Sequence, residues 1–266
     1  MNREKLLQQA TSGEDRLLLS RLADKAAKAE GTSSAAWSSF LDPRQQNLVE
    51  AAFNVALSDS AVMIRFEGGY EGAERNIVGF LPEVDWDLDD EAPLRLLALR
   101  KGGAGFAGEL SHRDYLGALM GLGIKREMIG DILVSAEGAK VVVMAEMAPF
   151  IRMQLDQVGS ERIEVSDVDF NALETPEPKE REIRGTVMSL RLDAVASLAF
   201  SVSRTRMADW IRAEKVTLNW EVQESPAKPV KEGDILSIRG KGRAILASLG
   251  GVSRKGRTGI VITRLV

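Results

Sequence analysis

The order of apolar and amphipathic segments between residues 92 and 172 constrains the fold of this chain more than any other feature. Strands are predicted at 94–100, 131–135, 140–144 and 162–165, and helices at 111–122 and 149–158. The order β-α-β-β-α-β is the split βαβ, or ferredoxin-like, arrangement. Residues 92–172 are therefore predicted to form a central ferredoxin-like domain, an architecture that proteins of many functions share.

Two further units flank this domain. Near the N-terminus the leucines have loosely helical spacing, Asp42-Pro43 is a helix start, and strands are predicted at 61–66 and 76–81 around a glycine-rich loop. Residues 1–84 are thus predicted to be a small α+β unit. A polar stretch with two prolines, 174–180, is typical of a semi-extended linker and separates a third unit, 181–266. The whole chain is predicted to be of the α+β class.

Charge is distributed unevenly between these units. Residues 181–266 hold 16 Lys and Arg against 8 Asp and Glu, a net charge of +8, whereas residues 1–180 hold 19 against 31, a net charge of −12. A basic C-terminal unit suits a polyanion, and an acidic remainder suits a protein partner or a surface turned away from the polyanion. The alternative explanation is an uneven solubilising surface.

The scarce residue types exclude several kinds of chemistry. The chain has no cysteine and one histidine, which excludes disulfides, thiolate metal sites, a cysteine nucleophile and multi-histidine metal sites. We predict no cofactor, no metal and no catalytic residue. No apolar run approaches the roughly 20 residues of a spanning helix. Because the N-terminus is also polar, we expect a cytoplasmic protein with no membrane partner.

The C-terminal unit carries basic residues on a predicted pair of helices. The first helix follows Ser189 and has its apolar positions on one face, and Ser203 is placed to cap the second, 204–213. Strands are predicted at 215–219 and 235–239, with a turn at 231–234 between them and a glycine-containing basic segment after them. The basic residues indicate a surface for phosphates, because guanidinium groups bind phosphates as bidentate forks.

These features resemble the S-four domain, the RNA-binding domain named after ribosomal small-subunit protein four. The resemblance covers about 60 residues, Val187 to Leu246, and rests on Arg191-Leu192-Asp193, Ser203-Arg204, 211–219, Gly233-Asp234 and Arg239-Gly240-Lys241-Gly242-Arg243. It implies a helix pair on a small sheet whose basic residues hold a folded RNA backbone. The RNA-binding residues expected on this basis are Arg191, Ser203, Arg204, Arg206, Arg212, Lys215, Asn219, Arg239, Lys241 and Arg243.

Nearby acids offer a plainer explanation for some of these arginines. Asp193, Asp209 and Glu214 are close enough in sequence to make incidental ion pairs on a solvated helix face. We expect Asp193 to orient Arg191 or cap the helix and Asp234 to belong to the strand turn, so neither is a catalytic acid.

Motifs elsewhere resemble YlmH-like proteins over nearly the full length. They are 40–46, 68–75, 111–117, 121–127 and 129–132. This resemblance implies a central RNA-recognition-like domain and binding to ribosomal and transfer RNA on the large ribosomal subunit during rescue of stalled translation; cyanobacterial and plastid relatives are photosystem II S-four proteins. Further RNA contacts are considered at His112, Arg113, Lys125, Arg126, Arg254, Lys255 and Arg257, with helix capping for His112 and ordinary surface charge as the alternatives.

Two patterns point to other functions and fail on context. The glycine pattern 103–108 matches a dinucleotide-binding loop, but no second parallel strand with a ribose-binding acid follows it. His112-Arg113-Asp114 copies the start of a kinase catalytic loop, but Leu119 stands where asparagine is required. Trp210 is predicted to pack rather than to recognise bases.

The sequence therefore favours a non-enzymatic protein that binds structured RNA. An RNA-modifying enzyme is the first alternative, because S-four domains are often attached to such enzymes, although no catalytic partner domain is evident here. The second alternative is an assembly factor, for photosystems or cell division, whose acidic N-terminal region recruits protein and whose RNA contact is secondary.

Overall fold

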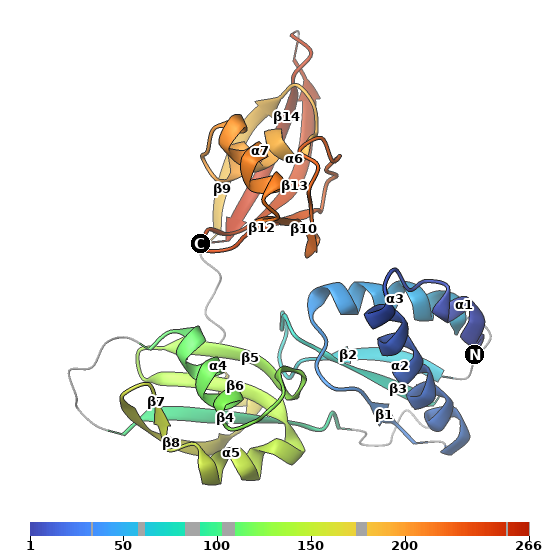
Figure 1. Ribbon diagram of the computed structural model, residues 1–266, viewed down its shortest axis with the longest axis vertical. Helices are drawn as coiled ribbons and strands as arrows, with labels where there is room; N and C mark the ends of the chain where they lie inside the picture. Colours follow the sequence, from blue (N-terminus) through green and yellow to red (C-terminus); the bar gives the residue numbers. More distant parts are fainter. Residues whose placement is uncertain are drawn as a thin grey trace. The chain divides into compact units, whose positions relative to one another are not determined.

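The computed structural model describes residues 1–32, 34–57, 62–82, 91–102, 110–173, 180–253 and 255–265. The chain forms two compact units, Met1–Thr175 and Pro176–Val266, which we describe separately (Figure 1). The first unit contains both of the predicted domains 1–84 and 92–172, and their separateness stays a prediction. None of the helices in the described ranges is long and apolar enough to cross a membrane.

The N-terminal part of the first unit packs helices against a small antiparallel sheet (Figure 1). The helices are α1 (Arg3–Leu7), α2 (Gly13–Thr32) and α3 (Pro43–Ala56), and the sheet order is β1 (Ala36–Trp37), β3 (Ile77–Pro82), β2 (Val62–Glu67). As predicted, α3 begins at Asp42-Pro43, because Asp42 and Gln45 form a capping box. Asp42 Oδ1 accepts a bond from Gln45 N at 2.8 Å, and Gln45 Oε1 accepts one from Asp42 N at 2.9 Å.

A buried ion pair fixes α2 against α3. The side chain of Asp15 is 1% exposed, and its carboxylate accepts bonds from Arg44 at 2.7 Å and from Thr11 Oγ1 at 2.6 Å. The hydrogen bond from Arg44, which outweighs the opposing effect of burial, holds the pKa of Asp15 well below its ordinary value. The folded state is therefore stabilised by the ionised carboxylate, and this contribution is lost as pH falls.

Replacing Asp15 with asparagine is expected to lower the free energy of unfolding by about 3 kcal/mol at pH 7, because the Arg44 charge loses its buried partner. The difference from the wild type should be full above about pH 4, the pKa of an unfolded aspartate, and should shrink as pH falls below it. Urea denaturation at several pH values measures this. Asp24→Asn is the matched control, because Asp24 is 64% exposed in its pair with Arg3; an equal loss in both variants would contradict the prediction.

The central part of the first unit has the predicted order β-α-β-β-α-β. Its elements are β4 (Leu94–Lys101), α4 (His112–Gly121), β5 (Ile129–Ser135), β6 (Gly138–Met144), α5 (Ala148–Gln154) and β8 (Glu161–Val168). The sheet order is β5-β6-β4-β8-β7, with every pair antiparallel. The helix predicted at 149–158 was too long. It ends at Gln154, and β7 (Gln157–Val158) turns back onto β8 through Gly159, whose φ is +60°.

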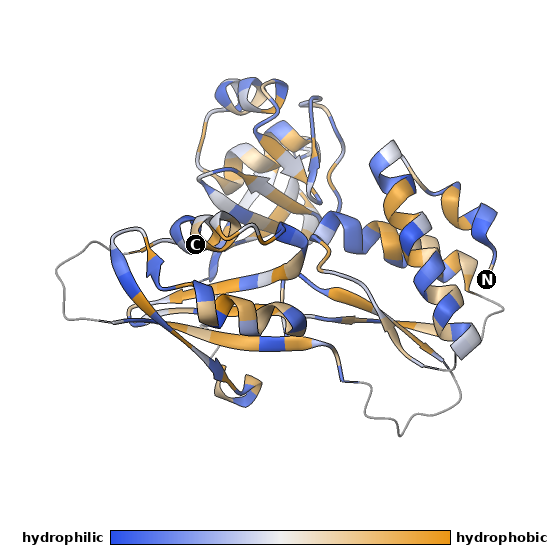
Figure 2. Ribbon diagram, turned by 60° about the horizontal axis from the view of Figure 1, so that its bottom comes forward, coloured by the Kyte–Doolittle hydropathy of each residue, from blue (hydrophilic) through white to orange (hydrophobic). Residues whose placement is uncertain are grey.

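Both faces of this sheet are buried. Tyr115 and Leu119 of α4 and Ile151 of α5 cover one face. On the other face, Phe40 and Ile77 of the N-terminal part pack against Leu96 and Val142 of the sheet. Apolar residues accordingly run along the central strands without strict alternation (Figure 2). The second buried face explains why the N-terminal part and the central part form one compact unit.

The second unit is a six-stranded antiparallel sheet with two short helices on one face (Figure 1). The elements are β9 (Glu180–Val187), α6 (Leu192–Ala199), α7 (Arg204–Arg212), β10 (Val216–Leu218), β11 (Glu221–Val222), β12 (Ile235–Ile238), β13 (Gly242–Val252) and β14 (Thr258–Leu265), in the sheet order β11-β10-β12-β13-β14-β9. Both helices bury apolar residues in one core with the sheet. The predicted helix pair and strands are confirmed, and the α+β class holds for the whole chain.

Strand β9 was not predicted. It pairs with β14 along its whole length, from Glu180 opposite Leu265 to Val187 opposite Thr258. Helix α6 lies so close to it that a Cβ on Gly185 would come within 2.4 Å of Leu198 Cδ2. The described part of the sheet thus begins at Glu180, and a side chain at position 185 would force the Leu198 side chain to move.

Candidate nucleic-acid interface

One buried carboxylate is shared by Arg191, the N-cap residue of α6, and Arg204, the first residue of α7. Asp193, in the first turn of α6, has a side chain 8% exposed. Its Oδ1 lies 3.1 Å from Nε of Arg191 and its Oδ2 lies 2.7 Å from a terminal nitrogen of Arg204. Burial opposes the charged form of Asp193, but hydrogen bonds from Arg191 and Arg204 outweigh it and lower its pKa. The carboxylate therefore stays ionised and aligns both guanidinium groups, and we call these three residues the Asp193 cluster.

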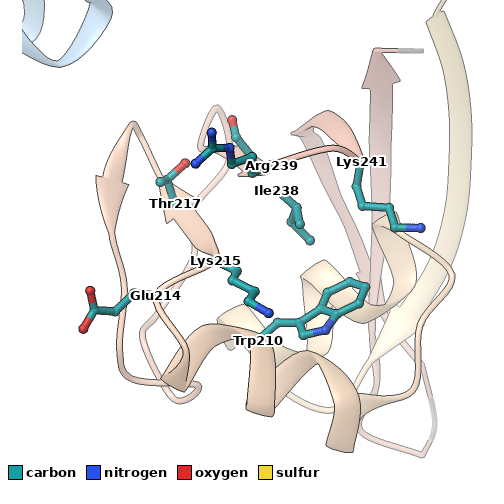
Figure 3. Close-up of a pocket in the computed structure, with 8 residues that line it drawn as sticks. Trp210, Glu214, Lys215, Thr217, Ile238, Arg239 and Lys241 are labelled. Carbon is teal, nitrogen blue, oxygen red and sulfur yellow. The ribbon is translucent and has the colours of Figure 1, made fainter.

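A groove of about 750 Å³ lies where the end of α7 faces the strands. It is lined by Trp210, Glu214, Lys215, Thr217, Ser237, Ile238, Arg239 and Lys241, and we call it the Trp210 groove. Figure 3 shows Trp210 and Lys215 on one side of the space, Arg239 across from them and Lys241 at the edge. Three cations against one acid make the groove basic, and the indole gives it an aromatic wall.

Arg206 joins this groove to the helix surface. Its guanidinium carbon lies 5.2 Å from the centroid of the Trp210 ring, in the geometry of a cation–π contact. Arg206, Lys215, Arg239 and Lys241 make no ion pair with any carboxylate among the residues that the structure describes. Their charge is therefore available to a ligand, in contrast to that of Arg212, which is 3.2 Å from Asp209.

A tight turn supports the strand side of the groove. Asn219 and Trp220 have φ of +51° and +63°, and they join β10 to β11 as a two-residue hairpin turn. Asn219 Nδ2 donates to Asp234 Oδ1 at 2.9 Å, and its Oδ1 accepts from Ile235 N at 2.9 Å. Asp234 thus has its predicted place in a strand turn, and Asn219 forms the turn that ends β10. An RNA contact by Asn219 stays a prediction.

The predicted RNA-binding residues fall into several groups. The Asp193 cluster brings together Arg191 and Arg204, and the Trp210 groove brings together Lys215, Arg239 and Lys241 with Arg206 against its indole. Ser203 caps α7 by accepting from Arg206 N at 3.3 Å. Arg243 is the cross-strand partner of Ser237, so both side chains lie on the sheet face that points away from the core, and Ser237 lines the groove. An RNA contact by Arg243 stays a prediction.

The additional basic residues near the C-terminus lie on the hairpin between β13 and β14. Arg257 donates to Thr186 Oγ1 at 2.8 Å and to Thr186 O at 2.6 Å, so its guanidinium anchors the hairpin to β9. Lys255 is exposed, and Arg254 lies outside the described residues.

The additional residues of the first unit lie around the start of α4 and the turn before β5. Ser111 and Asp114 form the N-terminal cap of α4, so capping does not require His112. His112, Arg113 and Lys125 are exposed. Partial desolvation by the neighbouring residues and, secondarily, the charge of Arg126 lower the pKa of His112. RNA contacts by these residues stay predictions. The glycine pattern 103–108 lies outside the described residues, and those that are described hold no cluster of three or more His, Asp or Glu suited to a metal.

Trp210 has a second position-dependent role beside the packing predicted for it. The residue is half-buried and packs against the core, as predicted, but it also forms a wall of the groove and lies under Arg206. The spacing of Arg206 and Trp210, four residues apart on one helix, was the available signal, since such residues are neighbours on a helix surface.

Known proteins match the chain in both units. The family model of the "RNA-binding domain in YlmH" matches residues 101–172, and that of the "S4 domain" matches residues 190–236. The chain is 37% identical over 226 residues to the ribosome-associated protein quality control protein P2 of Bacillus subtilis, covering 85% of each chain. It also resembles the fold of the cell division protein ylmH from Streptococcus pneumoniae, with a TM-score of 0.50 and 19% identity over 61% of this chain and 95% of that one.

A helix pair of the S-four type with a basic groove, joined to a ferredoxin-like domain, defines an RNA-binding protein. More closely, the chain belongs to the YlmH-like family, because a relative 37% identical matches it over 85% of both lengths. None of the proteins named above is a photosystem protein, so the photosystem type has no support.

Proposed function

We propose that the protein binds structured ribosomal or transfer RNA through the Asp193 cluster and the Trp210 groove, and that it acts on the large ribosomal subunit in translation quality control. The observation that carries this proposal is a set of four cations gathered around an indole, Arg206, Lys215, Arg239 and Lys241, none of which pairs with a carboxylate in the part of the chain that the structure describes. Cations bind phosphates, and aromatic rings stack on unpaired bases. The groove therefore suits a single-stranded segment of a structured RNA, such as a loop or an end. The ribosome association of the Bacillus subtilis relative supports the choice of RNA and a cytoplasmic location.

The salt dependence of RNA binding tests this proposal. Six cations lie on the helix pair and groove, and each phosphate they neutralise contributes about 0.7–0.9 to the slope of log K against log salt. We expect a slope of about −4 to −5 for a structured ribosomal RNA fragment bound to the full chain. A slope near zero would mean that these cations do not contact phosphates.

We further propose that the protein acts by binding and does not modify RNA. The residues that line the groove support this proposal, because cations and an indole are sufficient to bind an RNA strand. Mass analysis of a bound RNA before and after long incubation with the protein is expected to give identical nucleoside masses. A reproducible mass change that requires the protein would establish the enzyme alternative instead.

A further inference from the structure

A second cavity, of about 310 Å³, lies within the first unit, where three segments far apart in sequence meet. Its wall is formed by α2, by the residues that lead into α3, and by Arg75 and Arg126 beside the central sheet. Four of its lining residues are basic, Arg21, Lys25, Arg75 and Arg126, and two are acidic, Asp42 and Glu127. We call it the junction pocket.

Backbone carbonyls, and not carboxylates, hold the two inner guanidinium groups. Arg75 donates to Ile129 O at 3.1 Å and to Phe40 O at 3.4 Å. Arg126 donates to Gly130 O at 3.2 Å and also to Ile129 O. Neither arginine makes an ion pair with a carboxylate in the described part of the chain. Each keeps N–H donors beyond those used, because a guanidinium carries five.

The two guanidinium groups repel each other at a half-buried place. Burial and, secondarily, the charge of Arg75 lower the pKa of Arg126 to about 10, so both arginines remain protonated at neutral pH. The charges of Asp131 and Glu74, and for Arg75 also that of Asp42, partly offset this repulsion, but none of these carboxylates makes an ion pair with either arginine among the described residues. An anion bound between the two guanidinium groups would stabilise them further.

The loop that carries Arg75 is fixed in place. Asp131 on β5 accepts bonds from Tyr70 Oη at 2.7 Å, from Glu74 N at 2.7 Å and from Arg75 N at 3.1 Å. Its carboxylate is thereby occupied by the loop. The two acids of the pocket wall do not pair with these arginines among the described residues, because Asp42 caps α3 and Glu127 is exposed to solvent. The basic side of the pocket is thus preorganised, which reduces the ordering that a ligand would have to bring about.

We propose that the junction pocket binds a phosphate group carried on a nucleotide or an RNA strand. Arg75 and Arg126 offer planar donor forks that match a phosphate oxyanion, and Arg21 and Lys25 on α2 add charge at the rim. The volume lies near the lower end of small-ligand sites, roughly 300 Å³, so a phosphate with its sugar fits better than a larger ligand. This site is separate from the RNA surface of the second unit and does not rest on it.

Titration of the full chain tests the proposal with three probes: inorganic phosphate, adenosine 5′-monophosphate and a short single-stranded RNA with a 5′ hydroxyl. The variant is Arg21→Gln with Lys25→Gln, which spares the half-buried arginines and hence the fold. Its matched control is Arg16→Gln with Lys28→Gln, because these two exposed residues lie on the same helix and do not line the pocket. Backbone amide resonances of Ser38, Ser39 and Phe40 report on occupancy.

Each probe that binds the pocket is expected to shift these amide resonances, and the shifts should reach a plateau as its concentration rises. The pocket variant should bind roughly tenfold more weakly, because at least one charged hydrogen bond from the two rim cations is lost, while the control stays near the wild type. Shifts with the RNA assign the site to backbone phosphates, and shifts with only the two small probes assign it to free phosphate or to the phosphate of a mononucleotide. No shift with any probe, or equal weakening in the control, would overturn the proposal.

A further variant separates this site from the proposed function. Arg206→Glu with Lys241→Glu alters only the second unit and should leave the phosphate titration unchanged. Loss of RNA binding in that variant with intact phosphate shifts at Ser39 supports two separate sites. Loss of the phosphate shifts would show that the shifts report on the second unit, which would exclude the junction pocket as their source.

Discussion

Reversing two charges of the Trp210 groove, by Arg206→Glu with Lys241→Glu, is expected to weaken binding of structured RNA by roughly two orders of magnitude at physiological salt. Each cation makes a charged hydrogen bond of about 1.5–3 kcal/mol when it contacts a phosphate. The magnitude of the salt slope should fall by about 1.5–2, since two phosphate contacts disappear. Both residues are chosen because neither is tied to a carboxylate in the described part of the chain.

Arg204 is a poorer choice for charge reversal. A glutamate at position 204 would face the buried Asp193 carboxylate, so a loss of RNA binding could reflect unfolding. The matched control is Arg16→Glu with Lys28→Glu, which changes the net charge by the same amount at two exposed cations that lie outside the groove and make no ion pair among the described residues. Equal weakening by variant and control would mean that total charge, and not the groove, governs the affinity.

Replacing Asp193 with alanine is expected to have the largest effect on the second unit. The change leaves Arg191 and Arg204 adjacent without their shared carboxylate, and it should lower the free energy of unfolding by about 2 kcal/mol. Because both arginines are about half exposed, water compensates part of the loss, and the cost stays below that of a fully buried pair. Urea denaturation measures the change, and Asp209→Asn on the exposed face of α7 is the control.

RNA binding by the Asp193→Ala variant separates two explanations of this cluster. The variant gains one positive charge, so long-range attraction alone predicts tighter binding. If Asp193 positions the two arginines, binding weakens by roughly tenfold, since the guanidinium groups must be ordered anew when RNA binds. RNA affinity measured at a temperature below the thermal unfolding transition, with circular dichroism to verify that the variant is folded, decides between them. Tighter binding would contradict the positioning role.

Local signals predicted the helix starts well. Asp42-Pro43 and Ser203 each combine a capping side chain with the first turn of a helix, and the cap hydrogen bonds form within three residues along the chain. The β-α-β-β-α-β order was also readable, because strands buried on both faces leave short apolar runs that differ from the longer amphipathic helices. These features depend on neighbours in sequence and hence are visible in it.

Long-range pairing was harder to predict. Strand β9 has only Ile183 and Val187 as apolar side chains among charged ones, and its partner β14 lies more than 70 residues later. Nothing local distinguishes such a segment from a continuation of the polar linker. The junction pocket was hidden for the same reason, because Arg21, Arg75 and Arg126 come together only through tertiary contacts.

The types of residue at the RNA surface were predictable, but their grouping was not. The motif indicated arginines, and the structure adds that Arg191 and Arg204 share Asp193 while Arg206 lies over Trp210. Arg243 alternates with the core residues Ala244 and Leu246, so the period of two predicts that its side chain points away from the core. Its pairing with Ser237, which lines the groove, depends on the register of the sheet and was not visible in the sequence.

A crosslinking map of structured ribosomal RNA on the full chain tests the central claim most directly. Photocrosslinked peptides identified by mass spectrometry are expected to concentrate in α6, α7 and the turn 239–241, with the peptide that contains Trp210 among them. Weaker crosslinks near Arg126 are compatible with a second phosphate contact in the first unit. Crosslinks confined to the first unit, or to the sheet face that carries Arg184, with none between residues 191 and 241, would contradict the account.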